Sequence, residues 1–231
     1  NAMMSWGDKL LALGNKKRSR YSNLPLAYLG YYTDNGAYYY DRVDAKQKNY
    51  YNTLIALKNK FKQLNLPVAY MQYDSWWYTW GPDHGVDQWI PRTDSMTFPN
   101  GKLPDLDMPQ GLQMHNRYWS RETKYRNQFS FKQSSLNSTS GSGHGMSFPT
   151  KEPKNNQYDL FHHIMSNAKK IGNLTIYEQD WLENEFNFDF ALENIGEAES
   201  WLNAMNEAAE SLNIHIMYCM PNRADYLIST Q

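Results

Sequence analysis

The sequence predicts an α/β fold of the (β/α)8 TIM-barrel type, of which about five βα units lie within the chain. Segments typical of strands and segments with helical spacing follow one another in turn, which favours parallel strands joined by helices. Polar or aromatic residues follow each predicted strand. At 231 residues the chain is short for a complete barrel, which takes about 250 residues. We therefore expect a partial barrel.

The stretch 174–182 shows this pattern most clearly. Residues 174–177 are typical of a short buried strand, and Glu178 and Asp180 follow at its carboxyl end. In a parallel barrel this end is the catalytic face, where a carboxylate more often takes part in chemistry than in structure. Locally, a second interpretation is equally good, in which Asp180 caps a helix that begins near Trp181. The recurrence of the pattern elsewhere in the chain favours the strand end.

The other elements are expected from the same two patterns. Four further apolar runs are predicted to form strands: 26–32, 68–73, 111–115 and 214–220. Three segments with apolar residues at helical spacing are predicted to form helices: 46–64, 158–171 and 193–212. A further helix is expected to begin within 225–230.

The chain divides into an N-terminal segment, 1–23, and one domain, 24–231. The first two residues resemble the remnant of a cleaved tag, and a short amphipathic helix and a basic loop at 16–20 are expected after them. Within the domain, the serine- and glycine-rich stretch near 133–153 is predicted to be a flexible loop. We expect it to cover the catalytic face rather than to link two domains, because the alternation of strands and helices resumes after it.

The composition argues against several partners and cofactors. Lysine and arginine (23) nearly balance aspartate and glutamate (24), so nucleic acid is not an expected partner. No apolar run is long enough to cross a membrane, so no membrane partner is expected. The single cysteine, Cys219, excludes an internal disulfide and is interpreted as a small buried hydrophobe. No histidine pair has a metal-ligand spacing and no phosphate-binding loop is present, so neither a metal nor another cofactor is expected. The compartment stays open.

Aromatic residues make up 15% of the chain. We expect most of these rings to pack in the core and a few to stack on flat apolar ligand faces, such as those of sugars. Trp76 and Trp77 directly follow the second predicted strand. Because adjacent strand residues face opposite ways, we expect one of these indoles in the core and the other in the wall of a site.

Each predicted strand ends in candidate site residues. They are Asp34; Asp74 with Trp76 and Trp77; His115 with Arg117; Glu178 with Asp180; and Tyr218 with Arg223. Because the carboxyl ends of parallel strands meet at one mouth, we expect these side chains to converge. Two alternatives stay open: Asp34 as a turn residue, and Glu178 as an ion-pair partner of Arg117 or Arg223.

The strand ends resemble those of a known family of enzymes. The segments that carry the resemblance are Gln72-Tyr-Asp-Ser-Trp-Trp-Tyr78, Trp89 with Phe98-Pro-Asn-Gly101, Gly111-Leu-Gln-Met-His115 and Tyr177-Glu-Gln-Asp180. In this order they are similar to the retaining α-galactosidases and raffinose-synthase-like glycoside hydrolases of clan D, family 36. That resemblance implies an eightfold α/β barrel as the catalytic domain and a carbohydrate as the substrate.

The resemblance also assigns roles to residues of this chain. It makes Asp180 the nucleophile, because the family's nucleophile ends the fourth strand. It places four residues around the terminal sugar: Asp34, Asp74, Trp76 and Trp77. His115 and Arg117 would help to shape that pocket. The family usually has lysine two residues before the nucleophile, whereas this chain has Glu178.

The resemblance places the general acid/base on the sixth-strand loop, which is expected beyond Gln231. Retaining hydrolysis needs two carboxyl groups about 5 Å apart, so the chain alone is expected to turn over very slowly. The predicted function is therefore hydrolysis of α-linked sugars, within a protein of which this chain is a part. The alternative is an inactive carbohydrate-binding or interaction module that forms homo-oligomers through the exposed first and fifth strands.

Overall fold

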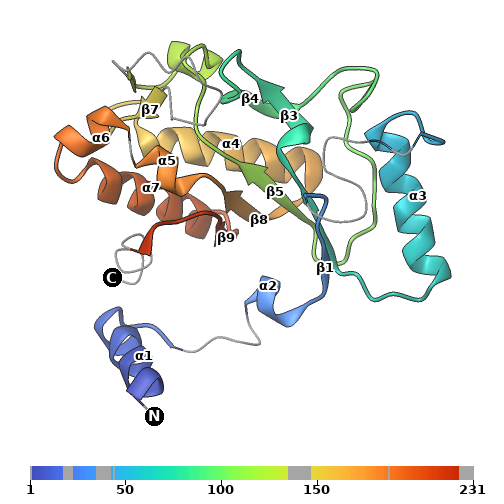
Figure 1. Cartoon of the computed structure of the whole chain (residues 1–231), viewed down its shortest axis with the longest axis horizontal. Coiled ribbons are helices and arrows are strands. Elements are labelled where there is room, and N and C mark those ends of the chain that lie inside the picture. Colours follow the sequence, from blue (N-terminus) through green and yellow to red (C-terminus); the bar gives the residue numbers. More distant parts are fainter. Residues whose placement is uncertain are drawn as a thin grey trace.

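The computed structural model describes residues 2–17, 23–34, 43, 45–134, 147–186 and 188–223. Its centre is a five-stranded parallel sheet (Figure 1) of β1 (Gly30–Tyr31), β2 (Tyr70–Tyr73), β5 (Leu112–Asn116), β8 (Leu174–Gln179) and β9 (His215–Tyr218). The order β1-β2-β5-β8-β9 follows the chain, without the reversal of a doubly wound sheet. This is the strand order of an α/β barrel, and the predicted α/β fold with five parallel strands is confirmed.

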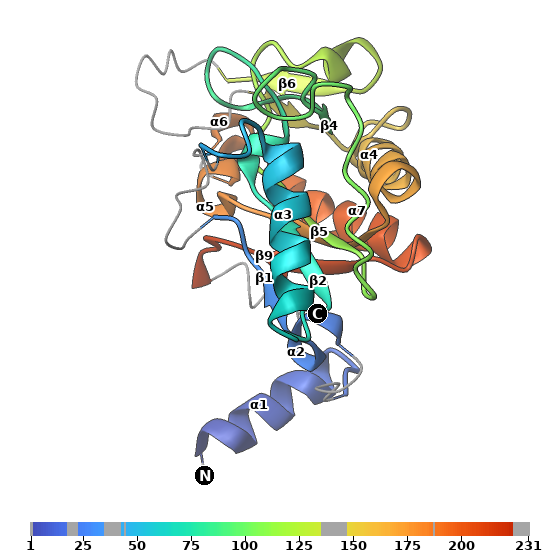
Figure 2. The same cartoon turned by 90° about the vertical axis from the view of Figure 1, so that its right-hand side faces the viewer.

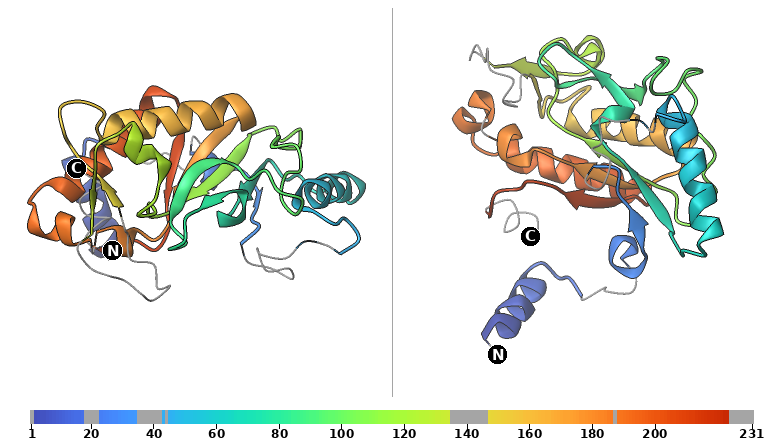
Figure 3. Two further views of the ribbon diagram at one scale, coloured as in Figure 1. Left: turned by 90° about the horizontal axis from the view of Figure 1, so that it is seen from above. Right: turned by 45° about the vertical axis from the view of Figure 1, so that its right-hand side comes forward.

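Three long helices pack on one face of the sheet. They are α3 (Tyr50–Gln63), α4 (Gln157–Gly172) and α7 (Glu197–Ser211). Figure 2 shows α3 in front of the sheet, and Figure 3 shows α4 and α7 alongside each other. Alternate strand residues such as Met71, Met114 and Tyr177 enter the same core cluster as Leu54 and Trp201 from the helices. The helical face is thus the outer side of the partial barrel.

The opposite, inner face has a smaller apolar layer. Leu24, Tyr70 and Ile176 form a separate buried cluster, against which Tyr32 and Met217 pack. Because strand side chains alternate between faces, the residues that follow on the same face are Gln72, Gln113 and Glu178, which are polar. The inner face therefore changes from apolar to polar toward the carboxyl ends of the strands.

Local signals set the bounds of the helices. Asn156 and Asp159 form a capping box at the start of α4, and Asn173 ends that helix with a left-handed φ of 51°. The predicted helix 193–212 corresponds to α7 and begins later than expected, because residue 193 still belongs to a short preceding helix, α6 (Asp189–Glu193). Gly196, with a φ of 85°, interrupts the helical backbone between them.

The predicted strand 26–32 is mostly wrong. Its first part belongs to a helical turn, α2 (Leu24–Ala27), and only the two residues of β1 pair with β2. Pro25 accounts for the difference, because its fixed φ suits the first turn of a helix and it has no N–H for a sheet.

The long loop after β2 has more structure than expected. A 3-10 turn, η1 (Ser75–Trp77), leads into an antiparallel hairpin of β3 (Tyr78–Trp80) and β4 (Val86–Pro91). A second 3-10 turn, η2 (Lys124–Asn127), comes before β6 (Phe131–Gln133), which pairs with β7 (Ser147–Pro149). Both ribbons make β-bridges to Trp119, just beyond β5.

Within the stretch 133–153, which was predicted to be a flexible loop, residue 133 belongs to β6 and residues 147–149 form β7. The centre of this stretch, 135–146, and the helix expected within 225–230 lie outside the described residues.

The remaining described helices are short or peripheral. The expected N-terminal helix is α1 (Ala2–Leu13), and α5 (Leu182–Glu185) follows β8. None of the described helices is both long enough and apolar enough to span a bilayer.

Replacing Gly111 tests how closely the backbone just before β5 approaches the backbone at the end of α4. We expect Gly111→Ala to lower the free energy of unfolding by about 3 kcal/mol, because its φ is +77° and an added β-carbon would lie 2.4 Å from the Asn173 carbonyl oxygen. Gly196→Ala is the matched control, since its φ of +85° is similar but the nearest atom lies 3.6 Å away. That change should cost about 1 kcal/mol. Urea unfolding measures both, and equal losses would contradict the close approach.

Candidate active site at the strand ends

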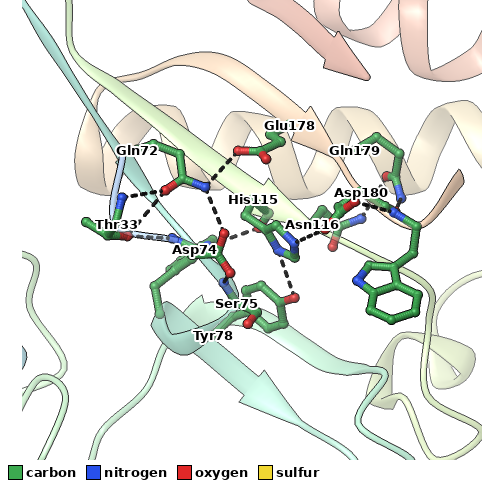
Figure 4. Close-up of polar contacts among 12 residues, drawn as sticks. Thr33, Gln72, Asp74, Ser75, Tyr78, His115, Asn116, Glu178, Gln179 and Asp180 are labelled. Atoms are coloured by element: carbon green, nitrogen blue, oxygen red, sulfur yellow. Dashed lines mark hydrogen bonds and ion pairs between the residues drawn. The ribbon is translucent and has the colours of Figure 1, made fainter. Parts of the chain in front are cut away.

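The inner face carries a hydrogen-bonded cluster at the carboxyl ends of β2, β5 and β8 (Figure 4). Its centre is His115. Its Nε2 lies 3.1 Å from Asp180 Oδ2, and its Nδ1 lies 3.1 Å from the hydroxyl oxygen of Tyr78. The side chain of His115 is 2% exposed and that of Asp180 is 14% exposed. The chain of contacts thus runs from a buried phenol, through a buried imidazole, to a carboxylate at the surface of the cluster.

Two tryptophans hold the backbone at His115. The indole N–H groups of Trp77 and Trp89 both donate to the His115 carbonyl oxygen, at 3.1 and 2.8 Å. The two rings pack edge to face, with centroids 4.9 Å apart. Because Trp77 ends η1 and Trp89 lies in β4, the hairpin after β2 fixes the end of β5.

A second layer lies below this one, around Glu178. Its Oε2 accepts hydrogen bonds from the side-chain amides of Gln72 and Gln113, at 3.0 and 2.7 Å. Thr33 N–H donates to Gln72 Oε1, and the Tyr32 hydroxyl donates to Gln113 Oε1, so both amides are oriented. Glu178 is thus bound by neutral amides, and the ion pair with Arg117 or Arg223 is not formed.

Asp74 joins the layer around Glu178 to the η1 turn. Its Oδ2 accepts from Gln72 Nε2 at 2.9 Å, and its Oδ1 accepts from the Ser75 N–H at 2.6 Å. The residue is 8% exposed. The carboxylate therefore starts the η1 turn and faces the inner side of the sheet at the same time.

Electrostatics separate the two carboxyl groups of β8. Burial raises the pKa of Glu178, which the charge of His115 and the two glutamine amides oppose only in part. Burial also acts to raise the pKa of Asp180, but the hydrogen bond and charge of His115 outweigh it and hold that pKa below the ordinary value. Asp180 is thus the more readily ionised group.

The pKa of His115 is raised as well. Burial alone would lower it, but the charges of Asp74 and Glu178 and the hydrogen bond to Asp180 favour the imidazolium. The positive charge of His115 and the negative charge of Asp180 therefore stabilise each other.

Four of the predicted site residues meet in this cluster: Asp74, His115, Glu178 and Asp180. Asp180 is not the N-cap residue of the helix that follows it, as the second interpretation expected. Trp181, with a φ of 58°, is the N-cap of α5, and Asp180 Oδ1 accepts only from the adjacent Trp181 N–H at 2.7 Å.

The expectation that one of the two indoles is in the core and the other lines a site does not agree with their burial. Trp76 and Trp77 are 2% and 0% exposed. Trp76 stacks on Tyr50, with centroids 4.0 Å apart, and donates to Thr33 Oγ1. The period-two argument failed because both residues lie in the η1 turn, where the backbone is no longer extended.

The other predicted residues lie at the margins. Asp34 is half-buried just beyond β1. Arg117 is 9% exposed and lies over the Trp80 ring at 5.0 Å, with its Nε and Nη2 lacking hydrogen-bond partners. Tyr218 packs against the helical core, on the face opposite to the cluster, and Arg223 is exposed beyond β9.

Several members of the cluster were not predicted. Gln72 and Gln113 each lie two residues before a predicted site residue, so the strand period could have indicated them. Tyr78 gave no such signal, because it follows an unpredicted turn. Cys219 is half-buried rather than part of the core, and its thiol lies beside the Asp180 carboxylate. Burial and that carboxylate raise the pKa of Cys219.

Two described cavities lie away from the cluster. One of about 370 Å³ is lined by residues near the amino ends of β5 and β8, including Gly111 and Lys169. Another, of about 450 Å³, lies beside the first turns of α4 and α7, near Gln157 and Ser200. Within the described ranges, no three histidine, cysteine, aspartate or glutamate side chains are grouped so that they could hold a metal ion.

Comparison with known proteins gives little beyond this geometry. No family model and no curated protein matches the chain. Among solved structures, the chain is similar to a GH31 α-xylosidase from a soil metagenome, complexed with xylose, with a TM-score of 0.47 and 13% identity. The match covers 80% of this chain and 29% of the xylosidase chain, so this chain spans less than a third of that enzyme.

His115 should make the stability of the protein depend on pH. Its folded pKa is raised above 6.5, so its charge stabilises the fold fully below that pH, and this contribution is lost as the pH rises through the folded value. We expect the stability difference between wild type and His115→Gln to be larger below pH 6.5 than well above it. Urea unfolding across this range measures the difference, and a constant value would contradict the coupling to Asp180.

Glu185, on α5, is a buried acid with a different environment. It is 0% exposed, and neither carboxyl oxygen has a hydrogen-bond partner. Burial raises its pKa to about 8, so the group is mostly protonated at neutral pH.

Replacing this acid should stabilise the protein at higher pH. The folded state holds a proton on Glu185 that the unfolded chain loses above pH 4.5, so wild-type stability falls as the pH rises from there to about 8. We expect Glu185→Gln to become more stable than wild type over this interval, by a few kcal/mol at its upper end. Thermal unfolding at several pH values measures the effect. A stability difference that does not change with pH would show that Glu185 gains a partner when it ionises.

Proposed function

We propose that the cluster at the strand ends is the sugar-binding and hydrolytic site of a retaining α-glycosidase, with Asp180 as the nucleophile. The proposal rests on Asp180, whose side chain is more exposed than that of His115 and whose pKa is lowered by this neighbour. A retaining nucleophile must be ionised and must reach the anomeric carbon, so both properties are required.

Its neighbours support this role. His115 Nε2 contacts one oxygen of the carboxylate and the Trp181 N–H donates to the other, so Asp180 is held in one orientation. Such positioning lowers the entropic cost of attack. Asp74 and Asp34, at the ends of neighbouring strands, are proposed to accept hydrogen bonds from sugar hydroxyl groups.

Glu178 is given a supporting role. It is 3% exposed, its pKa is raised and its Oε2 is occupied by two glutamine amides. We assign it to the floor of the site rather than to catalysis. The general acid/base is proposed to lie on a later strand of the parent protein, as the resemblance to the α-galactosidases implies.

A second candidate is a carbohydrate-binding or interaction module without activity. The burial of the cluster favours it, since Asp74, His115 and Glu178 are 8%, 1% and 3% exposed and both expected indoles are in the core. In this case β1 and β9, which form the edges of the sheet, are proposed to pair with other chains.

Glycosyl fluorides test the nucleophile by itself, because fluoride leaves without a proton from a general acid. We expect incubation with α-galactosyl or α-xylosyl fluoride to release fluoride and to add one glycosyl group to Asp180, detected by mass spectrometry of the protein. Asp180→Asn should lower the rate by about 10³-fold or more, whereas Asp105→Asn, an exposed carboxyl group at the other end of the sheet, should not.

The other outcomes separate or exclude the two candidates. Binding of the sugar without an adduct would favour the binding module. An adduct that persists in Asp180→Asn would remove Asp180 from the mechanism, and the absence of both binding and adduct would remove both candidates.

A further inference from the structure

The N-terminal helix α1 presents an apolar face to solvent. Met3, Trp6, Leu10 and Leu13 recur at spacings of three and four residues, so they lie along one side of the helix. No residue of α1 is buried, and Trp6 and Leu13 are 53% and 83% exposed. Figures 1 and 2 show α1 apart from the sheet and the helices that cover it. A helix of this length is marginal in water by itself, so its apolar face needs a surface to rest on.

The chain leaves α1 at a defined point. Asn15 has a left-handed φ of 49°, and the Lys16 N–H donates to the Leu11 carbonyl oxygen at 2.7 Å. These are the features of a Schellman helix end. Lys16 and Lys17 are exposed directly beyond it, next to the end of the apolar face.

The segment that contains α1 is basic, although the whole chain has a formal charge of −1. Residues 2–20 include five basic residues, at 9, 16, 17, 18 and 20, against one acidic residue, at 8. An apolar helical face beside a basic cluster is typical of helices that lie in the interface of a bilayer with anionic lipids.

We propose that α1 docks on an anionic lipid surface, with its apolar face at the acyl boundary and Lys16 and Lys17 at the headgroups. The expectation of no membrane partner concerned segments that cross a bilayer, and an interfacial helix needs no such length. A second copy of the chain would also cover the apolar face. It would not neutralise the basic cluster, however, because it would contribute a second cluster of the same sign.

Sedimentation of the full chain with lipid vesicles tests the proposal. We expect binding to vesicles of phosphatidylcholine with phosphatidylserine, and binding at least tenfold weaker to phosphatidylcholine alone. The double variants Trp6→Ser/Leu10→Ser and Lys16→Glu/Lys17→Glu should each weaken binding about tenfold or more. The matched control is Leu192→Ser/Ile195→Ser, which removes two exposed apolar residues from the domain and should leave binding unchanged.

Three results would overturn the proposal. They are no sedimentation of the wild-type chain with either vesicle, equal binding to the neutral and the anionic vesicles, and equal losses in the control variant. Ultracentrifugation without lipid tests the competing occupant. A dimer that Trp6→Ser/Leu10→Ser abolishes would assign the apolar face to a second copy and so contradict lipid docking.

Discussion

Glu178 imposes the main constraint on the inner face of the sheet. A carboxyl group that is almost out of water must receive hydrogen bonds, or its burial costs several kcal/mol. Gln72 and Gln113 donate these bonds from β2 and β5, and each amide is in turn oriented by a residue at or just beyond the end of β1. Four parallel strands are therefore held in one arrangement by a single buried group.

The layer above depends on that arrangement. Asp74 shares Gln72 with Glu178, and His115 lies two residues beyond Gln113 on the same side of β5. The indoles of Trp77 and Trp89 then hold the His115 carbonyl, and Trp119 joins both antiparallel ribbons to the end of the strand. The aromatic residues after the strands thus support the site from behind instead of lining it, which is why so many of them are buried.

Much of the fold could be predicted from the sequence, because periodicity reports burial directly. The helical spacing in α4 and the apolar runs of β2 and β8 predicted elements whose bounds agree closely with the structure, whereas α3 begins at Tyr50, later than the predicted start at residue 46. The prediction failed where a local residue overrides the pattern, as Pro25 does in the expected first strand. It also failed beyond β2, because the hairpin is stabilised by contacts with residues distant in sequence, such as Trp119.

The site could be predicted only in part, for a related reason. Carboxylates at strand ends have a position that follows from topology, so Asp74 and Asp180 could be brought together without a structure. The direction of an indole in a 3-10 turn, or the thiol contact of Cys219, depends on tertiary packing that no spacing encodes. Tyr218 was assigned to the wrong face, because adjacent strand residues alternate and Cys219 faces the cluster.

The pairing of β5 with β8 contains one irregularity that decides which residues can meet in the site. Leu112 is opposite Leu174, but Gln113 is opposite Ile176, so Thr175 is an extra residue without a counterpart. As a result, Leu174 and Tyr177 both serve the helical core although an odd number of positions separates them. The side of the sheet on which the Glu178 and Asp180 side chains lie is thus determined by the second half of β8 alone. A change in length before Thr175 would alter only the irregularity at this residue. One residue inserted after Thr175 would instead exchange the acidic and the apolar sides of the strand.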